Sequence, residues 1–214
     1  MNLIAKLVLL TSALIYSGIA SPGEPAAHKN NDSKRIVCFG NSITAGYGVD
    51  PTQAYPAVLQ HLIDQSGKKY EVINAGLSGD TSADGLSRID WILRQPVDIF
   101  LLELGGNDGL RGLSLDETLK NLQAIIDKVE KKYPEAKIVI AGMKIPPNMG
   151  ETYTHAFEKI YPELAQKNKV KLIPFLLAGV GGDPELNQPD GIHPNVKGHK
   201  IVAENVYKVI KDML

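Results

Sequence analysis

Five short apolar runs, separated by segments with helical spacing, constrain the fold of this chain more than any other feature. The runs are nearly continuous in apolar residues, which is typical of parallel strands covered on both faces. They lie at residues 35–39, 70–74, 98–104, 137–141 and 170–175. Helical spacing occurs at residues 53–65, 82–94, 115–132, 154–167 and 195–213. The alternation predicts one three-layer α/β domain with right-handed crossovers.

The bulk properties favour a globular domain without nucleic-acid affinity. The chain has 214 residues, 43% of them hydrophobic, which is enough for one sizeable core. Its 23 basic and 24 acidic side chains nearly balance, unlike the basic stripe of a nucleic-acid binder. Cys38 is the only cysteine, so no intramolecular disulfide can form. Because Cys38 lies within an apolar run, we expect a buried, unreactive thiol.

The N-terminus has the pattern of a secretory signal peptide. Lys6 precedes an apolar stretch at residues 7–15, and the small residues Gly18 and Ala20 suit a cleavage site after residue 20. The stretch is shorter than the roughly 20 apolar residues of a membrane span. We therefore expect a signal peptide at 1–20, a flexible leader at 21–34 and the folded domain at 35–214. We therefore expect the protein to be exported to the periplasm or the medium. The alternative is that the N-terminal segment is not cleaved and anchors the protein to the membrane.

Glycine-rich segments follow the predicted strands, where ligands bind in sheets of this kind. They lie at residues 40–48, 76–85, 105–112 and 142–150. Glycine lets backbone amides approach a ligand closely. The carboxyl edge of the sheet is therefore the expected site.

Three side chains can supply nucleophilic catalysis at that edge. Ser42 follows the first strand, and Asp190 precedes His193 by three residues in a loop bounded by Pro and Gly. A carboxylate so placed can orient an imidazole, which can take a proton from a serine. Each residue also has a structural interpretation, Ser42 as a helix N-cap and Asp190 as a turn former. Pro194 is expected to begin the last helix, which would place His193 at its start.

Other chemistries have little support. The sequence lacks G-x-S-x-G, G-x-G-x-x-G and the phosphate-binding loop, which argues against an α/β-hydrolase fold and against nucleotide cofactors. It also lacks H-E-x-x-H and Cys/His clusters, so we expect no metal and no cofactor. We expect the remaining histidines on the surface or on helix faces; these are His28, His61, His155 and His199.

Four blocks of the sequence resemble those of the SGNH (GDSL-type) hydrolases. They are GNSITAGYG at 40–48, SGDTS at 78–82, GGND at 105–108 and DGIHP at 190–194. Within that superfamily the chain is most similar to the bacterial, exported arylesterase, thioesterase I and lysophospholipase L1 group, through LELGGNDGLRG at 102–112. The resemblance covers residues 35–213 and implies a three-layer α/β/α, flavodoxin-like fold with a five-stranded parallel sheet.

The resemblance also implies roles for matching residues. Ser42 would be the nucleophile, His193 the general base and acid, and Asp190 the residue that orients His193. The oxyanion hole would consist of the amides of Ser42 and Gly79 and the side chain of Asn107. Substrate binding is expected at Gly109, Leu110, Arg111 and Ile145. Several apolar residues could line an acyl groove or belong to the core, namely Leu110, Leu113, Leu115, Ile145 and Met149.

One position departs from the family pattern. The family has Asp before the serine, and this chain has Asn41. The amide has nearly the same shape and can hold the turn by hydrogen bonds, but it brings no charge to the site.

The resulting hypothesis is a monomeric serine esterase that acts on small acyl esters, thioesters or lysophospholipids through an acyl-enzyme. A carbohydrate O-acetyl esterase on the same fold is one alternative. A non-catalytic ligand-binding protein is another, although it has no need of Ser42, Asp190 and His193 together.

Overall fold

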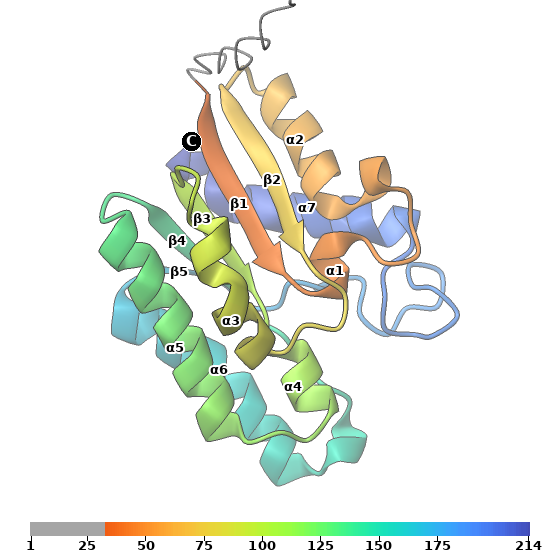
Figure 1. Ribbon diagram of the computed structural model, residues 1–214. Helices are drawn as coiled ribbons and strands as arrows, with labels where there is room; N and C mark the ends of the chain where they lie inside the picture. The colour runs from red at the N-terminus through yellow and green to blue at the C-terminus, as the bar shows by residue number, and fades with distance from the viewer. Residues whose placement is uncertain (1–32) are drawn as a thin grey trace, which may run out of the picture. The chain divides into compact units, whose positions relative to one another are not determined.

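Five parallel strands form one sheet in the computed structural model, which describes residues 33–214 (Figure 1). The strand order is β2-β1-β3-β4-β5. The strands are β1 Lys34–Gly40, β2 Tyr70–Gly76, β3 Ile99–Glu103, β4 Lys137–Ala141 and β5 Lys171–Ile173. The predicted five-stranded parallel sheet is confirmed. The expected signal peptide, most of the leader and His28 lie outside the described residues.

Helices cover the sheet in two groups. Their bounds are α1 Ser42–Ala45, α2 Tyr55–Gln65, α3 Ser82–Ile92, α4 Gly106–Leu110, α5 Leu115–Lys132, α6 Glu151–Asn168 and α7 Val196–Ile210. Single 3-10 turns lie at Pro51–Gln53, Pro147–Met149 and Lys211–Met213. Helix α5 packs against α3 and α6, whereas α2 packs against α7. In Figure 1, α3 and α5 lie in front of the sheet and α7 lies behind it, which gives the predicted three layers.

The apolar runs form the core because both faces of the central strands are covered. Every residue of β3 is buried, as are the last five residues of β1. Helix α5 turns a stripe of Leu122, Ile125, Ile126 and Val129 inward, at the spacing of one helix face. The Ser114 side chain caps its N-terminus by accepting from the amide of Glu117, so the helix begins where predicted.

Two of the element boundaries that differ from the predictions have clear local reasons. Strand β5 ends at Ile173, because Pro174 has no N–H for the ladder. Helix α7 begins at Val196, and Asn195 caps it by accepting from the amides of Lys197 and Gly198. Pro194 is instead paired with Asn187 in an isolated antiparallel bridge. The prediction that Pro194 begins the helix is therefore wrong, and His193 lies in the loop before it.

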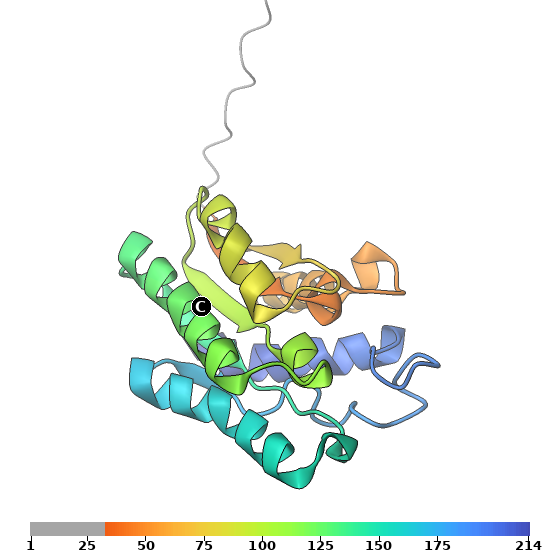
Figure 2. The same cartoon turned by 60° about the horizontal axis from the view of Figure 1, so that its bottom comes forward.

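The sheet topology brings distant glycine-rich segments together. β1 pairs with both β2 and β3. The chain therefore passes from β1 to β2 on one side and then crosses back to form β3 on the other side of β1. Such a switch point leaves a crevice at the carboxyl ends of the strands. Figure 2 brings this edge forward, with α1 (orange), α4 (green) and the blue loop that precedes α7 around it.

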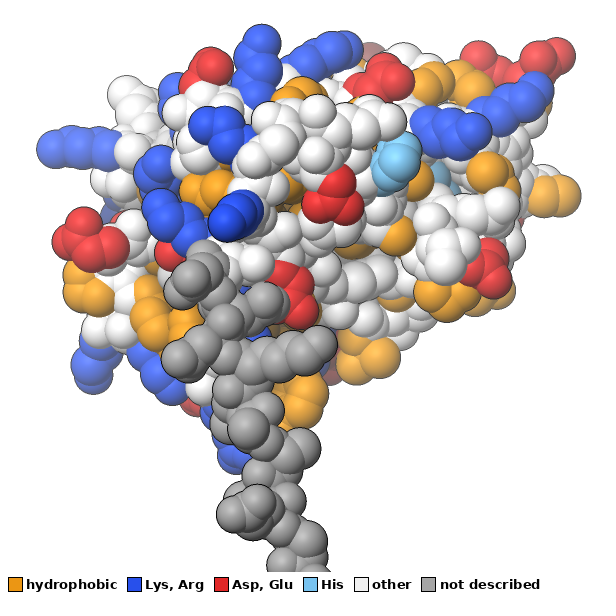
Figure 3. All heavy atoms as spheres, turned by 90° about the horizontal axis from the view of Figure 1, so that it is seen from above, with side chains coloured by type: hydrophobic (Ala, Val, Ile, Leu, Met, Phe, Trp, Pro, Cys, Tyr) orange, Lys and Arg blue, Asp and Glu red, His pale blue; other side chains and the backbone are white. Residues whose placement is uncertain are grey.

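The described surface carries charges of both signs. On the face in Figure 3, Lys and Arg side chains are interspersed with Asp, Glu and apolar side chains. Within residues 33–214, every helix is too short or too polar to cross a membrane.

Candidate active site

The turn between β1 and α1 presents the hydroxyl of Ser42. The Asn41 side chain caps α1 by accepting from the amide of Ile43 at 3.0 Å. Gly46 ends this four-residue helix in the left-handed region, with φ 79°, which favours glycine. Because Asn41 is the cap, the structural interpretation of Ser42 as an N-cap is wrong. The serine hydroxyl lies 3.4 Å from the same Oδ1 of Asn41 and makes a shorter contact with another side chain.

The partner of that hydroxyl is His193. The Nε2 atom of His193 lies 2.9 Å from Oγ of Ser42, and Nδ1 lies 2.7 Å from Oδ2 of Asp190. When Nδ1–H donates to the carboxylate, Nε2 carries the lone pair that faces the hydroxyl. The ring of Tyr47 packs against the imidazole, with centroids 4.8 Å apart. The three residues expected to act together thus form one continuous chain of hydrogen bonds.

Asp190 is held as a carboxylate by the loop that contains it. Its Oδ1 accepts from the backbone amides of Ile192 at 2.9 Å and His193 at 3.0 Å. Burial acts to raise the pKa of Asp190, but these amides and the imidazole outweigh it and lower the pKa to about 2. Gly191, with φ 71°, allows the sharp turn that brings both amides to one oxygen. Asp190 is therefore ionised throughout the neutral range.

Candidate oxyanion donors come from two further loops, and one of them, Asn107, lines the same cavity as Ser42. Asn107, in the first turn of α4, donates from Nδ2 to the carbonyl of Asp80 at 2.8 Å, which joins the α4 start to the loop after β2. The amide of Gly79 in that loop donates to no acceptor within residues 33–214. The amide of Ser42 is in the first turn of α1, where an N–H has no intrahelical acceptor. These groups suit the stabilisation of a developing oxyanion.

Two arginines fix the loop that contains Gly79. Arg88 on α3 donates from Nε to Asp80 at 2.6 Å and from Nη2 to the carbonyl of Gly40 at 3.0 Å. Arg111 donates from Nη2 to the carbonyl of Gly79 at 3.0 Å. The role of Arg111 in the structure is thus to hold the loop, and it was missed because the contact joins residues 32 apart.

A cavity of about 540 Å³ opens beside Ser42 and His193. Leu110 and Ile145 line it as expected, whereas Gly109 and Arg111 do not. Gly109 is buried beneath the lining, where a Cβ would lie 2.7 Å from Ile145 and from Phe157. Other apolar lining comes from the loops after β4 and β5 and was not predicted from the sequence; these residues are Met143, Pro146, Pro147, Phe175 and Leu177. Their position after strand ends is the signal that could have found them.

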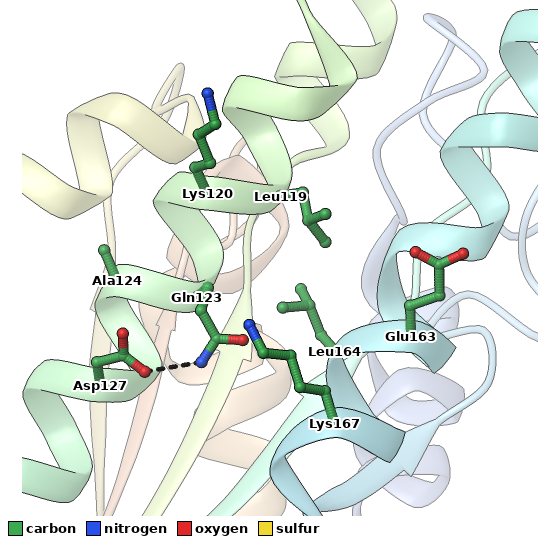
Figure 4. Close-up of a pocket in the computed structure, with 8 residues that line it drawn as sticks. All are labelled: Leu119, Lys120, Gln123, Ala124, Asp127, Glu163, Leu164 and Lys167. Carbon is green, nitrogen blue, oxygen red and sulfur yellow. Dashed lines mark hydrogen bonds between the residues drawn. The ribbon is translucent and has the colours of Figure 1, made fainter.

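A smaller cavity of about 290 Å³ lies on the outer face between α5 and α6 (Figure 4). Leu119 and Leu164 form its apolar part, and a hydrogen bond joins Gln123 to Asp127 at its side. It shares no lining residue with the cavity beside Ser42. It contains no serine, cysteine or histidine, so the nucleophilic chemistry belongs to the larger cavity.

Two other reactive side chains are buried away from the cavity. His199 is 1% exposed, and its Nδ1 accepts from the amide of Tyr55 at 3.2 Å. It lies on a helix as expected but not on the surface, because α7 packs this face against α2. Burial, with a smaller contribution from His193, lowers the pKa of His199 to about 4. Cys38 is buried as predicted, and burial raises the pKa of its thiol to about 12, which makes it a poor nucleophile.

Metal binding has no support in the part of the chain that the structure describes. There, no three His, Cys, Asp or Glu side chains come together as metal ligands. The chemistry available at the cavity is that of Ser42, His193 and Asp190.

A serine hydroxyl bonded to an aspartate-supported imidazole, at the carboxyl edge of a parallel α/β sheet, defines the class of serine hydrolases. The sequence profile of the GDSL-like lipase/acylhydrolase family matches residues 38–201. The chain therefore belongs to this family, and it is a carboxylic ester hydrolase.

Similar proteins support the same classification. Esterase TesA from Pseudomonas aeruginosa is 38% identical over 183 residues, covering 85% of this chain and 90% of the relative. Thioesterase 1/protease 1/lysophospholipase L1 from Escherichia coli is 37% identical over 180 residues, covering 84% of each chain. A crystal structure of TesA superimposes with a TM-score of 0.81 at 38% identity, covering 85% of this chain and all of that one.

Proposed function

We propose that Ser42 is the nucleophile of this esterase, that His193 is its general base and acid, and that Asp190 orients His193. The observation that carries the proposal is the pair of contacts that link Ser42 Oγ to Nε2 and Nδ1 to Asp190, at 2.9 and 2.7 Å. Each contact is within the reach that proton transfer requires. The hydroxyl of Ser42 therefore lies within reach of its proposed base.

The proposed reaction has two halves. As Oγ of Ser42 attacks the ester carbonyl, Nε2 of His193 takes the hydroxyl proton, and Asp190 stabilises the imidazolium. His193 then returns this proton to the leaving alcohol or thiol as the C–O or C–S bond breaks, which leaves an acyl-serine. Water attacks the acyl-serine and gives its proton to His193. The acid is released when that proton returns to Oγ.

The oxyanion of each tetrahedral intermediate is assigned to Ser42, Gly79 and Asn107. Among the described residues the amide of Gly79 has no competing acceptor, and Asn107 has a second N–H beyond the one that it donates to Asp80. Preorganised donors of this kind favour the transition state over the bound ester.

The proposed substrates are small esters or thioesters with an apolar acyl chain, including lysophospholipids. The cavity beside Ser42 is lined largely by apolar side chains from α4 and from the loops after β4 and β5, which suits an acyl chain. The relatives include an esterase, an arylesterase and a thioesterase/lysophospholipase. These names support the same substrate class here.

Hydrolysis of p-nitrophenyl esters from acetate to palmitate, by wild type and Ser42→Ala, tests the proposal. We expect a preference for chains longer than acetate and loss of turnover in the variant. Ser66→Ala is a matched control, because Ser66 is the C-cap of α2 and its hydroxyl donates to the carbonyl of Ile63. A sharp preference for acetate would favour the carbohydrate O-acetyl esterase instead. Equal rates for wild type and Ser42→Ala would reject Ser42 as the nucleophile.

We further propose that residues 1–20 are removed on export, on the basis of the Lys6 and apolar pattern at the N-terminus. N-terminal sequencing of the protein recovered outside the cytoplasm should begin at Ser21. An intact N-terminus in a membrane fraction would support the anchor instead.

A further inference from the structure

Gln188 joins the loop that carries His193 to the turn that carries Ser42, and the mechanism above gives it no role. Its side-chain Nε2 donates to the carbonyl of Tyr47 at 2.6 Å and to the carbonyl of Pro194 at 3.1 Å. Tyr47 lies two residues after α1 and 141 residues from Gln188 in the chain. Both N–H groups of the amide are thereby used, and only the nitrogen can face two carbonyl oxygens.

The backbone of Gln188 closes the loop around His193. Its N–H donates to the carbonyl of His193 at 2.8 Å, and its carbonyl accepts from the amide of Gly191 at 2.9 Å. The side-chain bond to Pro194 holds the residue that follows the histidine. Three hydrogen bonds thus fix Gln188 within the loop, and the fourth goes to Tyr47.

Tyr47 continues the connection to Ser42. Its N–H donates to the carbonyl of Ser42 at 3.0 Å, while its own carbonyl accepts from Gln188. Hydrogen bonds therefore run from Ser42 through Tyr47 and Gln188 to His193, behind the direct contact between Oγ and Nε2. Within residues 33–214, the Gln188–Tyr47 bond and this direct contact are the two hydrogen bonds between residues 41–50 and 183–195.

Gly48 leaves room for the side chain of Gln188. Its φ of 76° lies in the left-handed region, which favours glycine, and a Cβ there would collide with Oε1 of Gln188. A methyl group at position 48 would therefore displace the amide that bonds Tyr47 without removing a donor. Because the ring of Tyr47 packs against the imidazole of His193, moving Tyr47 disturbs the base as well as the turn of Ser42.

We propose that Gln188 is a positioning residue that sets the separation of Ser42 and His193 by tying their loops together through Tyr47. The inference rests on the proposed roles of Ser42 and His193. Proton transfer needs the hydroxyl within hydrogen-bond reach of the imidazole, and misplacement by about 1 Å can lower a rate by ~10²-fold. Gln188 does not line the cavity beside Ser42, so its loss should lower kcat and leave KM nearly unchanged.

A double-mutant cycle tests the connection. Gln188→Met removes both donors at nearly constant length, Gly48→Ala obstructs the amide with both donors present, and the double variant combines the changes. These proteins and wild type are compared for kcat and KM on p-nitrophenyl butyrate at pH 8, and for unfolding temperature. We expect each single change to lower kcat by about 5- to 50-fold, with KM within about twofold. In the Gln188→Met background, Gly48→Ala should lower kcat by no more than about twofold, because the bond that it breaks is already absent.

Gln60→Met is the matched control. Gln60 on α2 also donates from Nε2 to a backbone carbonyl, that of Tyr70 at 2.9 Å, and its Oε1 accepts from the amide of Val72 at 2.6 Å. It thus joins α2 to the start of β2, at the opposite end of the strand from the catalytic edge. We expect Gln60→Met to lower the unfolding temperature without lowering kcat.

Three results would overturn the inference. They are an unchanged kcat in Gln188→Met, an equal fall in kcat for Gln60→Met, and single effects of Gly48→Ala and Gln188→Met that multiply in the double variant. If Gln188→Met does not fold, Gln188→Asn takes its place in the cycle, because its shorter amide does not span both carbonyls. Unfolding temperatures measure the Gly48–Gln188 coupling without a catalytic assay. An inactive wild type with that coupling intact would therefore reject the proposed function and not the connection between the loops.

Discussion

Nε2 of His193 lies 2.9 Å from Oγ of Ser42, although 151 residues separate them in the chain. Ser42 is placed by the turn after β1 and His193 by the loop that precedes α7. Both loops lie at the carboxyl edge of the sheet, so the fold itself places His193 next to Ser42.

Replacing Asp190 by Asn should lower kcat by ~10⁴-fold, because the imidazole loses the carboxylate that orients it and stabilises its charge. The backbone amides of Ile192 and His193 can still donate to the remaining oxygen, so the loop should stay folded. Steady-state kinetics on p-nitrophenyl butyrate measure the loss. Asp183→Asn is the control, because Asp183 accepts from the amide of Glu185 in the same region and should keep full activity. Equal kinetics for the two variants would reject the role of Asp190.

The acid limb of the pH profile should report His193 and not Asp190. The pKa of Asp190, lowered to about 2, leaves it ionised over the whole assay range. Only a neutral imidazole can accept the serine proton, so kcat/KM should be lower in acid than at neutral pH. Initial rates from pH 4 to 9 test this. A flat profile would count against His193 as the base.

Replacing Asn107 by Ala should lower kcat by ~10²–10³-fold and change KM much less, because an oxyanion donor acts mainly in the transition state. The change also removes the bond to the Asp80 carbonyl, so unfolding temperature has to be measured beside the kinetics. Asn168→Ala is a suitable control, since Asn168 also donates to a backbone carbonyl but lies at the end of α6. An increase in KM alone would contradict the oxyanion role.

Enlarging Ile145 to Trp should shorten the accepted acyl chain. Ile145 is buried in the cavity lining, so a larger side chain removes space for the distal carbons. We expect kcat/KM for palmitate to fall at least ~10-fold relative to acetate. Leu113→Trp, at an exposed site outside the lining, should leave the ratio unchanged. An unaltered chain-length profile in Ile145→Trp would place the acyl chain elsewhere.

His199 should make the protein less stable in acid. Burial lowers its pKa from 6.5 to about 4, so between these values the unfolded chain binds a proton that the folded chain does not. The contribution of His199 to the free energy of unfolding is complete above pH 6.5. It decreases by about 3 kcal/mol as the pH falls towards 4. Glu103 changes the free energy of unfolding with pH in the opposite direction, because its raised pKa makes the folded state bind the extra proton.

Urea unfolding of wild type and His199→Asn at pH 4.5 and 7.5 separates the two effects, since both proteins contain Glu103. The Asn side chain can still accept from the amide of Tyr55. We expect the stability advantage of wild type over the variant to shrink in acid. A constant difference between the two pH values would contradict this assignment.

The fold could be predicted from the sequence because its signals are local. The continuous apolar pattern of β3 and the spacing and cap of α5 depend on neighbouring residues only, and both elements lie where predicted. The predicted start of α7 was wrong because the side chain of Asn195, and not Pro194, accepts hydrogen bonds from the first free backbone amides of the helix.

Contacts between distant segments were harder to predict. Arg111 holds Gly79 from another loop, and Glu103 reaches Asn41 across the strand pair, so spacing alone gives no signal for either. The family resemblance supplied the candidate roles of Ser42, Asp190 and His193, and the sheet topology explains why these residues meet.

Trapping the nucleophile tests the central claim most directly. Wild type, Ser42→Ala and His193→Ala are treated with a p-nitrophenyl alkylphosphonate, and the adduct is located by peptide mass spectrometry. The account predicts one phosphonyl group per molecule on Ser42, none in Ser42→Ala, and labelling slowed by orders of magnitude in His193→Ala. An adduct on another residue, or equal labelling of wild type and His193→Ala, would contradict the proposed triad.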